Sequence, residues 1–250
     1  MKIAVAGATG RVGHHVVDAL REQGHEAVPM SRATGVDVIS GAGLADALRG
    51  VDVVIDTATG PSPEQQAATE FFTTAARNLH EAGRDAGVQR LVAVSIIGID
   101  GSVAGYNAAK LAHEKEVLGG PIPARVLRAA QFHEFVEQLV GWGTHGDVAH
   151  VPAMRTQLVA ARSVAEELVA LAVRPASDAP GAPIPEIAGP REERLADAAR
   201  LLAVRRGAPA HIEEVSDPSN PDRDLFENGG LLPGPHAVLA GPTYAEWLER

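Results

Sequence analysis

The sequence predicts an α/β fold, a doubly wound parallel sheet with a small C-terminal α+β lobe. Short apolar runs alternate with amphipathic helical segments through the first half of the chain, which is the pattern of a parallel sheet covered on both faces. A glycine-rich turn joins the first apolar run to the first helical segment. The length of 250 residues is sufficient for one large α/β unit with its own core.

The expected strands are short apolar runs, and the lack of polar alternation over residues 91–97 indicates that this strand is buried on both faces. In chain order they span residues 3–6, 27–30, 36–39, 51–55, 91–97 and 124–127. The expected helices carry apolar residues three or four positions apart. They span residues 12–20, 44–48, 64–86 and 107–118, and six strands with these helices between them give the doubly wound sheet.

The regular alternation weakens after about residue 135, where we expect a change of organisation. Helices are expected over 164–173 and 192–203 and a strand over 211–215, separated by Pro/Gly clusters at 175–185 and 218–235 that indicate loops. We therefore expect a core of residues 1–135 and a smaller lobe of residues 136–250 in one structural unit. The lobe would pack on the carboxyl edge of the sheet and bind the substrate, because α/β proteins bind ligands at that edge.

Composition excludes several classes of function. The chain has no cysteine, so disulfides and thiolate metal sites are excluded. No pair of histidines has the helical spacing of metal ligands with a carboxylate partner, and we expect no metal site. A net charge of −10 and few aromatic residues argue against nucleic-acid binding. The N-terminal apolar run is too short for a signal peptide and no stretch is long enough to span a bilayer, so we expect a cytoplasmic protein with no membrane contact. No oligomeric state follows from the sequence.

The turn at residues 7–13, Gly-Ala-Thr-Gly-Arg-Val-Gly, lies between the first expected strand and the first expected helix. Gly7 permits a tight turn, Gly10 permits close approach of the backbone to a pyrophosphate, and Gly13 lets the helix pack against the sheet. The helix N-terminus then offers its N–H groups and its positive dipole end to the phosphates. This context predicts a dinucleotide site whose contacts are Gly7, Thr9, Gly10, Arg11, Val12 and Gly13.

The end of the second strand bears on which dinucleotide binds. A site for NAD(H) usually places an acid there for the ribose 2′-hydroxyl, whereas this chain has Met30, Ser31 and Arg32. Ser31 and Arg32 can donate to a 2′-phosphate, so we expect NADP(H) as the preferred cofactor with NAD(H) possible. Arg11 is a second candidate neighbour of that phosphate, and the alternative for Arg32 is a solvated loop residue.

A tyrosine and a lysine, Tyr106 and Lys110, lie four residues apart in a segment expected to be helical. The chain has only two tyrosines and three lysines, so the spacing is informative. A nearby ammonium lowers the pKa of a phenol and makes it a better acid–base catalyst, and Lys110 can also reach ribose hydroxyls. Ser95, near the end of the fifth expected strand, is a candidate to hold a substrate carbonyl oxygen. The alternative is a pair that only packs on a helix surface.

Taken in this order, the glycine turn, Ser95, Tyr106 and Lys110 resemble the short-chain dehydrogenase/reductase superfamily. The sequences of residues 7–13, and of residues 127–132 after the sixth expected strand, are similar to those of its NmrA-like NAD(P)-binding branch. The resemblance covers about residues 1–135. It implies a Rossmann fold in which Tyr106 is the general acid/base, Lys110 holds ribose and tunes Tyr106, and Ser95 positions the carbonyl.

The chain also departs from the superfamily's usual pattern. The segment between Ser95 and Tyr106 is short, Ser102 is a second candidate for the serine role, and Asn78 is displaced from the position of the superfamily's helical asparagine. Three functions therefore stay open. The first is an NAD(P)H-dependent oxidoreductase that transfers hydride to a small carbonyl or quinone-like substrate. The second is a non-catalytic NADP(H)-sensing regulatory protein, and the third is an NAD(P)-dependent epimerase or dehydratase.

Two further groups of residues complete the expected site. Thr57 and Thr59 follow the fourth expected strand and are candidates to touch the cofactor ribose. Gln131, Phe132 and His133 follow the sixth, where the superfamily's chain passes the nicotinamide, and we expect them to line the substrate pocket. For His133, a structural role in the core is an equal alternative.

Overall fold

The computed structural model describes residues 1–175 and 182–250. The described residues form two compact units. Unit 1 consists of residues 1–95, 105–128 and 164–185, and unit 2 consists of residues 96–104, 129–163 and 186–250. The Pro/Gly cluster expected as a loop at 175–185 lies partly outside the described residues.

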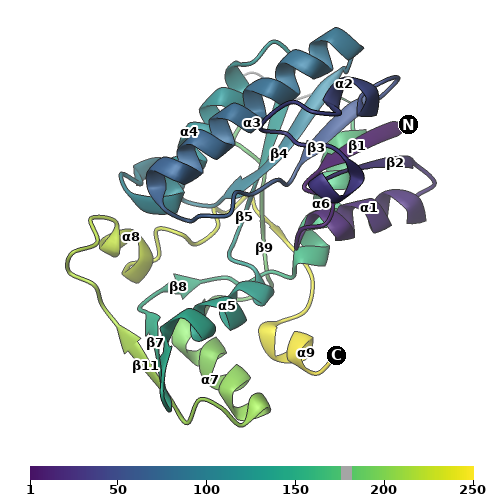
Figure 1. Ribbon diagram of the computed structural model, residues 1–250. Helices are drawn as coiled ribbons and strands as arrows, with labels where there is room; N and C mark the ends of the chain where they lie inside the picture. The colour runs from purple at the N-terminus through teal and green to yellow at the C-terminus, as the bar shows by residue number, and fades with distance from the viewer. Residues whose placement is uncertain (176–181) are drawn as a thin grey trace. The chain divides into compact units, whose positions relative to one another are not determined.

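The central sheet is a seven-stranded one with the strand order β12-β9-β5-β4-β3-β1-β2 (Figure 1). Its parallel pairs include β1 with β2, β1 with β3, and β3 with β4. The predicted α/β class with a parallel sheet is therefore confirmed. The strands are β1 (Lys2–Ala6), β2 (Glu26–Met30), β3 (Val53–Asp56), β4 (Arg90–Ile96), β5 (Ala124–Ala129), β9 (Glu186–Ala188) and β12 (Val238–Leu239).

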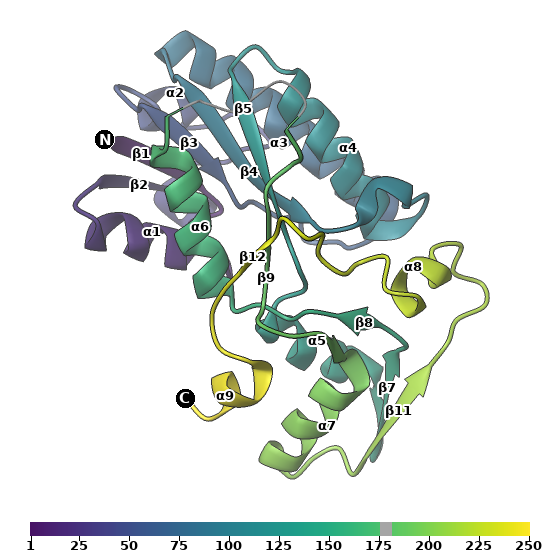
Figure 2. The same ribbon diagram turned by 180° about the vertical axis from the view of Figure 1, so that it is seen from behind.

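Helices cover both faces of the sheet in unit 1, which explains why its strands are buried along their length. Helices α3 (Gln65–Ala86) and α4 (Gly105–Gly119) lie side by side on one face (Figure 1). Helices α1 (Gly13–Glu22) and α6 (Ala161–Val173) lie on the other face (Figure 2). All four residues of β3 are buried, as are four of the five in β1. Parallel strands covered in this way lose the polar alternation of a one-sided sheet.

One expected strand is wrong. Residues 36–39 form a turn in the structure, between the 3₁₀ helix η1 (Arg32–Thr34) and the short helix α2 (Leu44–Ala47). The Asp37 carboxylate accepts a hydrogen bond from the Ile39 N–H at 2.9 Å, and the Gly41 N–H donates to the Asp37 carbonyl at 2.9 Å. An aspartate that bonds the backbone two residues on favours a turn over an extended strand.

The long helix α3 has clear signals at both ends. The Glu64 carboxylate accepts hydrogen bonds from the Gln66 and Ala67 N–H groups at the N-terminus, and Gly87 ends the helix with a φ of 79° in the left-handed region. Its buried residue Phe72 packs in one cluster with Ala109 and Tyr106 of α4. This contact positions the first turns of α4, where the predicted catalytic residues lie.

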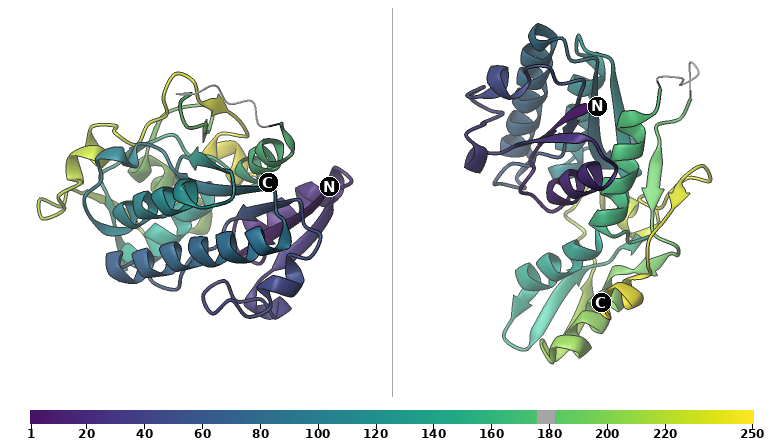
Figure 3. Two further views of the ribbon diagram at one scale, coloured as in Figure 1. Left: turned by 90° about the horizontal axis from the view of Figure 1, so that it is seen from above. Right: turned by 90° about the vertical axis from the view of Figure 1, so that its right-hand side faces the viewer.

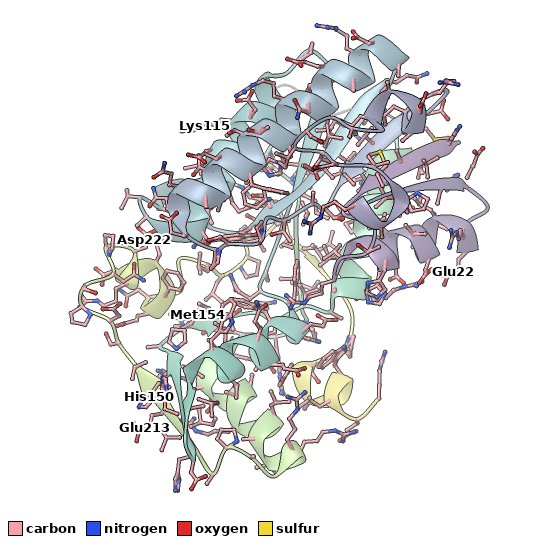
Figure 4. All side chains as sticks on the ribbon, in the orientation of Figure 1. Glu22, Lys115, His150, Met154, Glu213 and Asp222 are labelled. Carbon is pink, nitrogen blue, oxygen red and sulfur yellow. The ribbon has the colours of Figure 1, made fainter. Side chains whose placement is uncertain are left out.

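Unit 2 contains two small sheets with helices of its own. A three-stranded sheet pairs β11 (His211–Val215), β7 (Val148–Pro152) and β6 (Thr144–His145). His150 and Glu213 lie beside each other on its neighbouring strands, with 3.3 Å between Nε2 and Oε2 (Figure 4). A two-stranded sheet pairs β8 (Arg155–Thr156) with β10 (Glu193–Arg194). The helices are α5 (His133–Gly143), α7 (Leu195–Arg206), α8 (Arg223–Glu227) and α9 (Tyr244–Leu248), and a 3₁₀ turn, η2 (Ile99–Gly101), precedes α4.

A buried aspartate in unit 2 holds the segment that leads into α4. The Asp222 carboxylate accepts hydrogen bonds from the Val103 N–H at 3.0 Å and from the Ala104 N–H at 3.3 Å. These bonds fix the last residues before α4 begins at Gly105.

In the described part of the chain, none of the helices combines the length and apolar character that crossing a membrane requires.

Candidate functional site

The candidate site lies in unit 1, where β1, β2 and β3 end and α1 and α4 begin. Residues 7–12 join β1 to α1, and both elements are drawn in purple in the right-hand view of Figure 3. Gly7 has a φ of 73°, in the left-handed region that favours glycine. The Gly10 N–H donates to the Gly7 carbonyl at 2.8 Å and closes the turn. A Cβ on Gly13 would lie 2.1 Å from the Gly7 carbonyl oxygen and 2.8 Å from Thr57 Oγ1. The spacing of the three glycines therefore lets α1 pack directly on the turn.

The N-terminus of α1 is suited to bind an anion. Its N-cap residue is Val12, no side chain caps the helix, and its first turn carries no acidic residue. The free N–H groups and the positive end of the helix dipole are then available to a ligand phosphate. The turn and the N-terminus of α1 are therefore suited to a phosphate group.

The end of β2 carries Ser31 and Arg32 with no acid beside them. Ser31 is extended and its N–H donates to Thr34 Oγ1 at 2.9 Å. Arg32 begins η1 and is exposed. The charge of Arg32 also influences Asp37, five residues further along the chain. The pKa of Asp37 is lowered mainly by the hydrogen bond from the Ile39 N–H and to a smaller extent by the Arg32 charge.

The two threonines after β3 have different partners. The Thr57 hydroxyl donates to the Ala6 carbonyl at 2.7 Å and so joins the ends of β1 and β3. Thr59 Oγ1 lies 3.1 Å from the hydroxyl oxygen of Tyr106. The structure thus brings Thr59 together with the predicted acid–base residue, while the hydroxyl of Thr57 is used to hold the glycine turn.

Tyr106 is in the first turn of α4, with its ring packed edge-on against Phe72 at 5.6 Å between centroids. Burial raises the pKa of its hydroxyl, and the Thr59 hydrogen bond and the Arg11 charge oppose this rise. The sequence led us to expect a lowered pKa caused by Lys110. The structure differs because the ammonium of Lys110 has other partners. A raised pKa keeps the phenol protonated at neutral pH.

Lys110 is almost completely buried, with 5% of its surface exposed. Its ammonium donates to the Val94 carbonyl at 2.8 Å and to His113 Nδ1 at 2.8 Å. It also lies 4.3 Å from the centroid of the Phe72 ring, a favourable position for a cation. Burial lowers the pKa of Lys110 to about 8, against the opposing charges of Asp56 and Glu114. By contrast, Lys115, one turn further along α4, is exposed (Figure 4).

Two acids and a histidine that the sequence analysis missed surround Lys110. His113 Nε2 lies 3.1 Å from Asp56 Oδ2, and both side chains are buried. Glu114 forms a buried two-point ion pair with Arg128 of β5, with distances of 2.9 and 2.8 Å. The spacing from Lys110 to His113, three residues along one helix, was the available signal. The partner Asp56 is 57 positions away from His113 in the sequence, so no local pattern reveals it.

Both serine candidates carry buried hydroxyls. Ser95 is 3% exposed and Ser102 is 6% exposed. Within residues 1–175 and 182–250, neither hydroxyl has a hydrogen-bond partner. Such a group costs free energy, and a ligand oxygen would satisfy it. Ser95 belongs to unit 1 with Tyr106 and Lys110, whereas Ser102 belongs to unit 2. Asn78, the displaced asparagine, donates to the carbonyls of Val38 and Ile39 and holds that turn.

The three predicted pocket residues are in unit 2 and take part in its packing. Gln131 Oε1 accepts from the Thr156 hydroxyl at 2.6 Å, and Phe132 forms an isolated β-bridge with Val159. His133 is fully buried, with Nε2 donating to the Leu158 carbonyl at 3.1 Å. Its ring lies 5.4 Å from both Tyr244 and Trp247. These contacts favour the structural alternative for His133.

Residues 7–120 match the family model described as NAD(P)H-binding. No curated protein sequence matches this chain. The fold is similar to the solved structure of MoeE5 in complex with UDP-glucose and NAD, with 18% identity and a TM-score of 0.73 over 100% of this chain and 99% of that chain. It is also similar to a short-chain dehydrogenase/reductase superfamily protein from Agrobacterium tumefaciens with bound NAD, at 19% identity and a TM-score of 0.70 over 100% and 95% of the two chains.

A third similar structure is TunA, an NAD-dependent NDP-hexosamine 5,6-dehydratase. Its identity is 18%, its TM-score is 0.66, and the match covers 86% of this chain and 84% of that one. At these identities the likeness to solved structures shows the fold. The family model and these structures agree with the NAD(P)-binding Rossmann-type fold that the resemblance predicts for the first half of the chain.

Replacing Gly13 by alanine should disturb the turn. The added Cβ would overlap the Gly7 carbonyl oxygen, which is backbone and cannot move away freely. We expect a loss of roughly 1–3 kcal/mol in the free energy of unfolding and at least a roughly tenfold weaker affinity for NAD(P)H. Denaturant unfolding and cofactor titration measure both. Gly119→Ala is the matched control, because a Cβ there has open space. Equal behaviour of the two variants would contradict the packing described for the turn.

The buried His133 predicts a pH dependence of stability. Burial lowers its pKa from 6.5 to about 4, so between these values the unfolded chain binds a proton that the folded chain does not. The free energy of unfolding therefore falls as the pH falls from 6.5 towards 4, by up to about 3 kcal/mol. Denaturant unfolding at several pH values should show a smaller fall in His133→Phe than in the exposed control His211→Asn. Equal falls would exclude His133 as the source.

Proposed function

We propose that this chain, whose residues 7–120 match the NAD(P)H-binding family and whose fold is that of the short-chain dehydrogenase/reductase superfamily, is an NADP(H)-dependent oxidoreductase acting on a small carbonyl or quinone-like compound. The observation that carries the proposal is the place of Tyr106. Its hydroxyl bonds Thr59, just past β3, and feels the charge of Arg11 in the glycine turn. An acid–base group thus lies next to the turn that fits a pyrophosphate.

The cofactor would be held by the residues predicted for it. The backbone of Gly7, Thr9, Gly10, Arg11, Val12 and Gly13 would cradle the pyrophosphate at the uncapped N-terminus of α1. Arg32 and Ser31 would bind a 2′-phosphate, which supports NADP(H) over NAD(H) because no acid follows β2 to accept from a ribose hydroxyl. Thr59 and Lys110 would contact the ribose of the nicotinamide half. Thr57 would act indirectly, because its hydrogen bond to the Ala6 carbonyl holds the glycine turn in place.

In this proposal NADP(H) supplies or accepts the hydride, and the chain supplies the proton. Tyr106 delivers its phenolic proton to the carbonyl oxygen as that oxygen gains charge. Because burial raises the pKa of Tyr106, the phenol is protonated at neutral pH, which favours the direction of carbonyl reduction. The Ser95 hydroxyl, which lacks a partner among the described residues, would donate to the same oxygen. The Thr59 hydroxyl and the Arg11 charge, which both oppose the rise in the pKa of Tyr106, would stabilise the resulting phenolate.

We propose, as the sequence predicts, that the smaller C-terminal lobe binds the substrate. Its predicted contacts are Gln131, Phe132 and His133, and for His133 the packing against Tyr244 and Trp247 favours the structural alternative. We also propose that the chain belongs to the NmrA-like branch, because the sequences of residues 7–13 and 127–132 are similar to that branch.

Two other functions have a specific observation in their favour. Structures similar to this chain include MoeE5 with UDP-glucose and the dehydratase TunA, which favours an epimerase or dehydratase that uses its dinucleotide transiently. The engagement of Lys110 with Val94 and His113 favours a non-catalytic NADP(H) sensor. The three functions give different results in an assay. Turnover with a carbonyl indicates the oxidoreductase, turnover with a nucleotide sugar indicates the epimerase or dehydratase, and binding without turnover indicates the sensor.

Replacing Arg32 by alanine should reduce the affinity for NADPH and leave that for NADH unchanged. Loss of a charge-assisted hydrogen bond to the 2′-phosphate costs about 1.5–3 kcal/mol, which is roughly a 10- to 150-fold rise in the dissociation constant. Calorimetric titration of both cofactors measures it. Arg21→Ala, an exposed arginine in the last turn of α1, is the control. An equal loss for NADH, or a wild-type chain that binds both alike, would contradict the NADP(H) preference.

Replacing Tyr106 by phenylalanine should abolish most turnover while NADPH still binds. Removal of a general acid lowers the rate by about 10²- to 10⁴-fold, and the phenylalanine ring keeps the packing against Phe72. Assays of NADPH oxidation with a panel of carbonyls and quinones measure the rate. Turnover that is indifferent to the substitution would rule out Tyr106 as the proton donor.

A further inference from the structure

The ammonium of Lys110 has three N–H donors and uses two of them inside the protein. One donates to the Val94 carbonyl of β4 and one to His113 Nδ1 of α4. Among the residues that the structure describes, these are its hydrogen-bond partners, and the ring of Phe72 from α3 covers it at 4.3 Å. One N–H is therefore left for a ligand.

The bond from Lys110 determines which nitrogen of His113 carries a proton. An ammonium donates and cannot accept, so Nδ1 of His113 must be the unprotonated nitrogen. The proton is then on Nε2, which lies 3.1 Å from Asp56 Oδ2 and donates to it. His113 is thus neutral in this arrangement, and burial together with the Lys110 charge lowers its pKa accordingly.

Asp56 completes a buried chain of charges and hydrogen bonds. It lies at the end of β3, is 1% exposed, and accepts from the Ala58 N–H at 2.9 Å as well as from His113. Burial opposes ionisation of Asp56, but the bond from His113, the bond from Ala58 and the Lys110 charge hold its pKa below the ordinary value. A buried cation and a buried anion are therefore joined through one imidazole.

We propose that Asp56 and His113 are positioning residues for Lys110: Asp56 orients the His113 ring, and the ring and the Val94 carbonyl together fix the ammonium so that a single N–H remains for the ligand. We call Asp56, His113 and Lys110 the Lys110 cluster. Its effect on catalysis rests on the proposed function, whereas the arrangement itself does not.

The titratable groups around Lys110 come from two elements. Asp56 comes from β3, and His113 and Glu114 come from α4. Glu114 is already paired with Arg128 of β5, which leaves Asp56 as the unshared counter-charge of Lys110. Helix α3 contributes the uncharged ring of Phe72, and β4 contributes a carbonyl. Changing Asp56 alone therefore tests the cluster without disturbing the second pair.

The small number of lysines makes the cluster directly observable. The chain has three, Lys2, Lys110 and Lys115, so protein labelled with ¹³C at lysine Cε gives three resonances that Lys2→Arg and Lys115→Arg assign. In the cofactor-free protein we expect Lys110 to titrate at about pH 8. In Asp56→Asn, which still accepts from His113 but carries no charge, we expect the midpoint to fall by about one pH unit.

The control is Asp52→Asn. Asp52 lies just before β3, the strand that ends at Asp56, and its carboxylate accepts a hydrogen bond from the Lys2 N–H. It should leave the Lys110 midpoint unchanged. A folded Asp56→Asn protein with an unshifted midpoint would overturn the proposal. If that variant fails to fold, ¹⁵N spectra of histidines in the wild-type protein decide, with His113 identified by its contacts to the Phe72 ring. The neutral tautomer with a proton on Nε2 at pH 7 is the expected result, and a charged His113 or a proton on Nδ1 would overturn it.

These measurements separate the cluster from the proposed function because no cofactor or substrate is present. Failure of NADPH to bind would reject the proposed function and leave the tautomer and titration results standing. If both hold, Asp56→Asn should weaken NADPH binding more at pH 8 than at pH 6, since Lys110 loses its charge earlier in the variant. A loss of affinity that is equal at both pH values would show a structural role for Asp56 and overturn the functional consequence.

Discussion

A buried ammonium must replace its lost water with fixed partners, and in this protein the partners of Lys110 connect the elements around it. The Val94 carbonyl belongs to β4, His113 to α4, Asp56 to β3 and the Phe72 ring to α3. Tyr106 lies one turn before Lys110 and packs on the same Phe72 ring. The position of Tyr106, the proposed acid–base residue, thus depends on a network that satisfies a buried charge.

The sequence predicted those parts of the site that local chemistry determines. The glycine turn, the order of strands and helices up to β5 and the pairing of Tyr106 with Lys110 on one helix all follow from spacings within a few residues. The expected strand at 36–39 failed because Asp37 bonds the backbone of Ile39 and makes a turn, a competition that apolar periodicity does not register. Strands β9 and β12 were missed because they are three and two residues long.

Long-range contacts account for the rest of what the sequence left unpredicted. Lys110 was expected to lower the pKa of Tyr106, yet its donors are taken by a carbonyl on β4 and a histidine oriented by Asp56. Asp56 reads as the last residue of a buried strand, and nothing in its neighbourhood in the sequence indicates a partner on α4. Similar structures at 15–20% identity share the fold.

A crystal structure of the chain with NADP⁺ is the decisive measurement. We expect the pyrophosphate at the N-terminus of α1 and the 2′-phosphate within about 3.2 Å of the Arg32 guanidinium. We also expect Lys110 to keep its bonds to Val94 and His113 while its third N–H meets a ribose hydroxyl. A 2′-phosphate in solvent away from Arg32, or an ammonium that leaves His113 to reach the ribose, would contradict the proposed site.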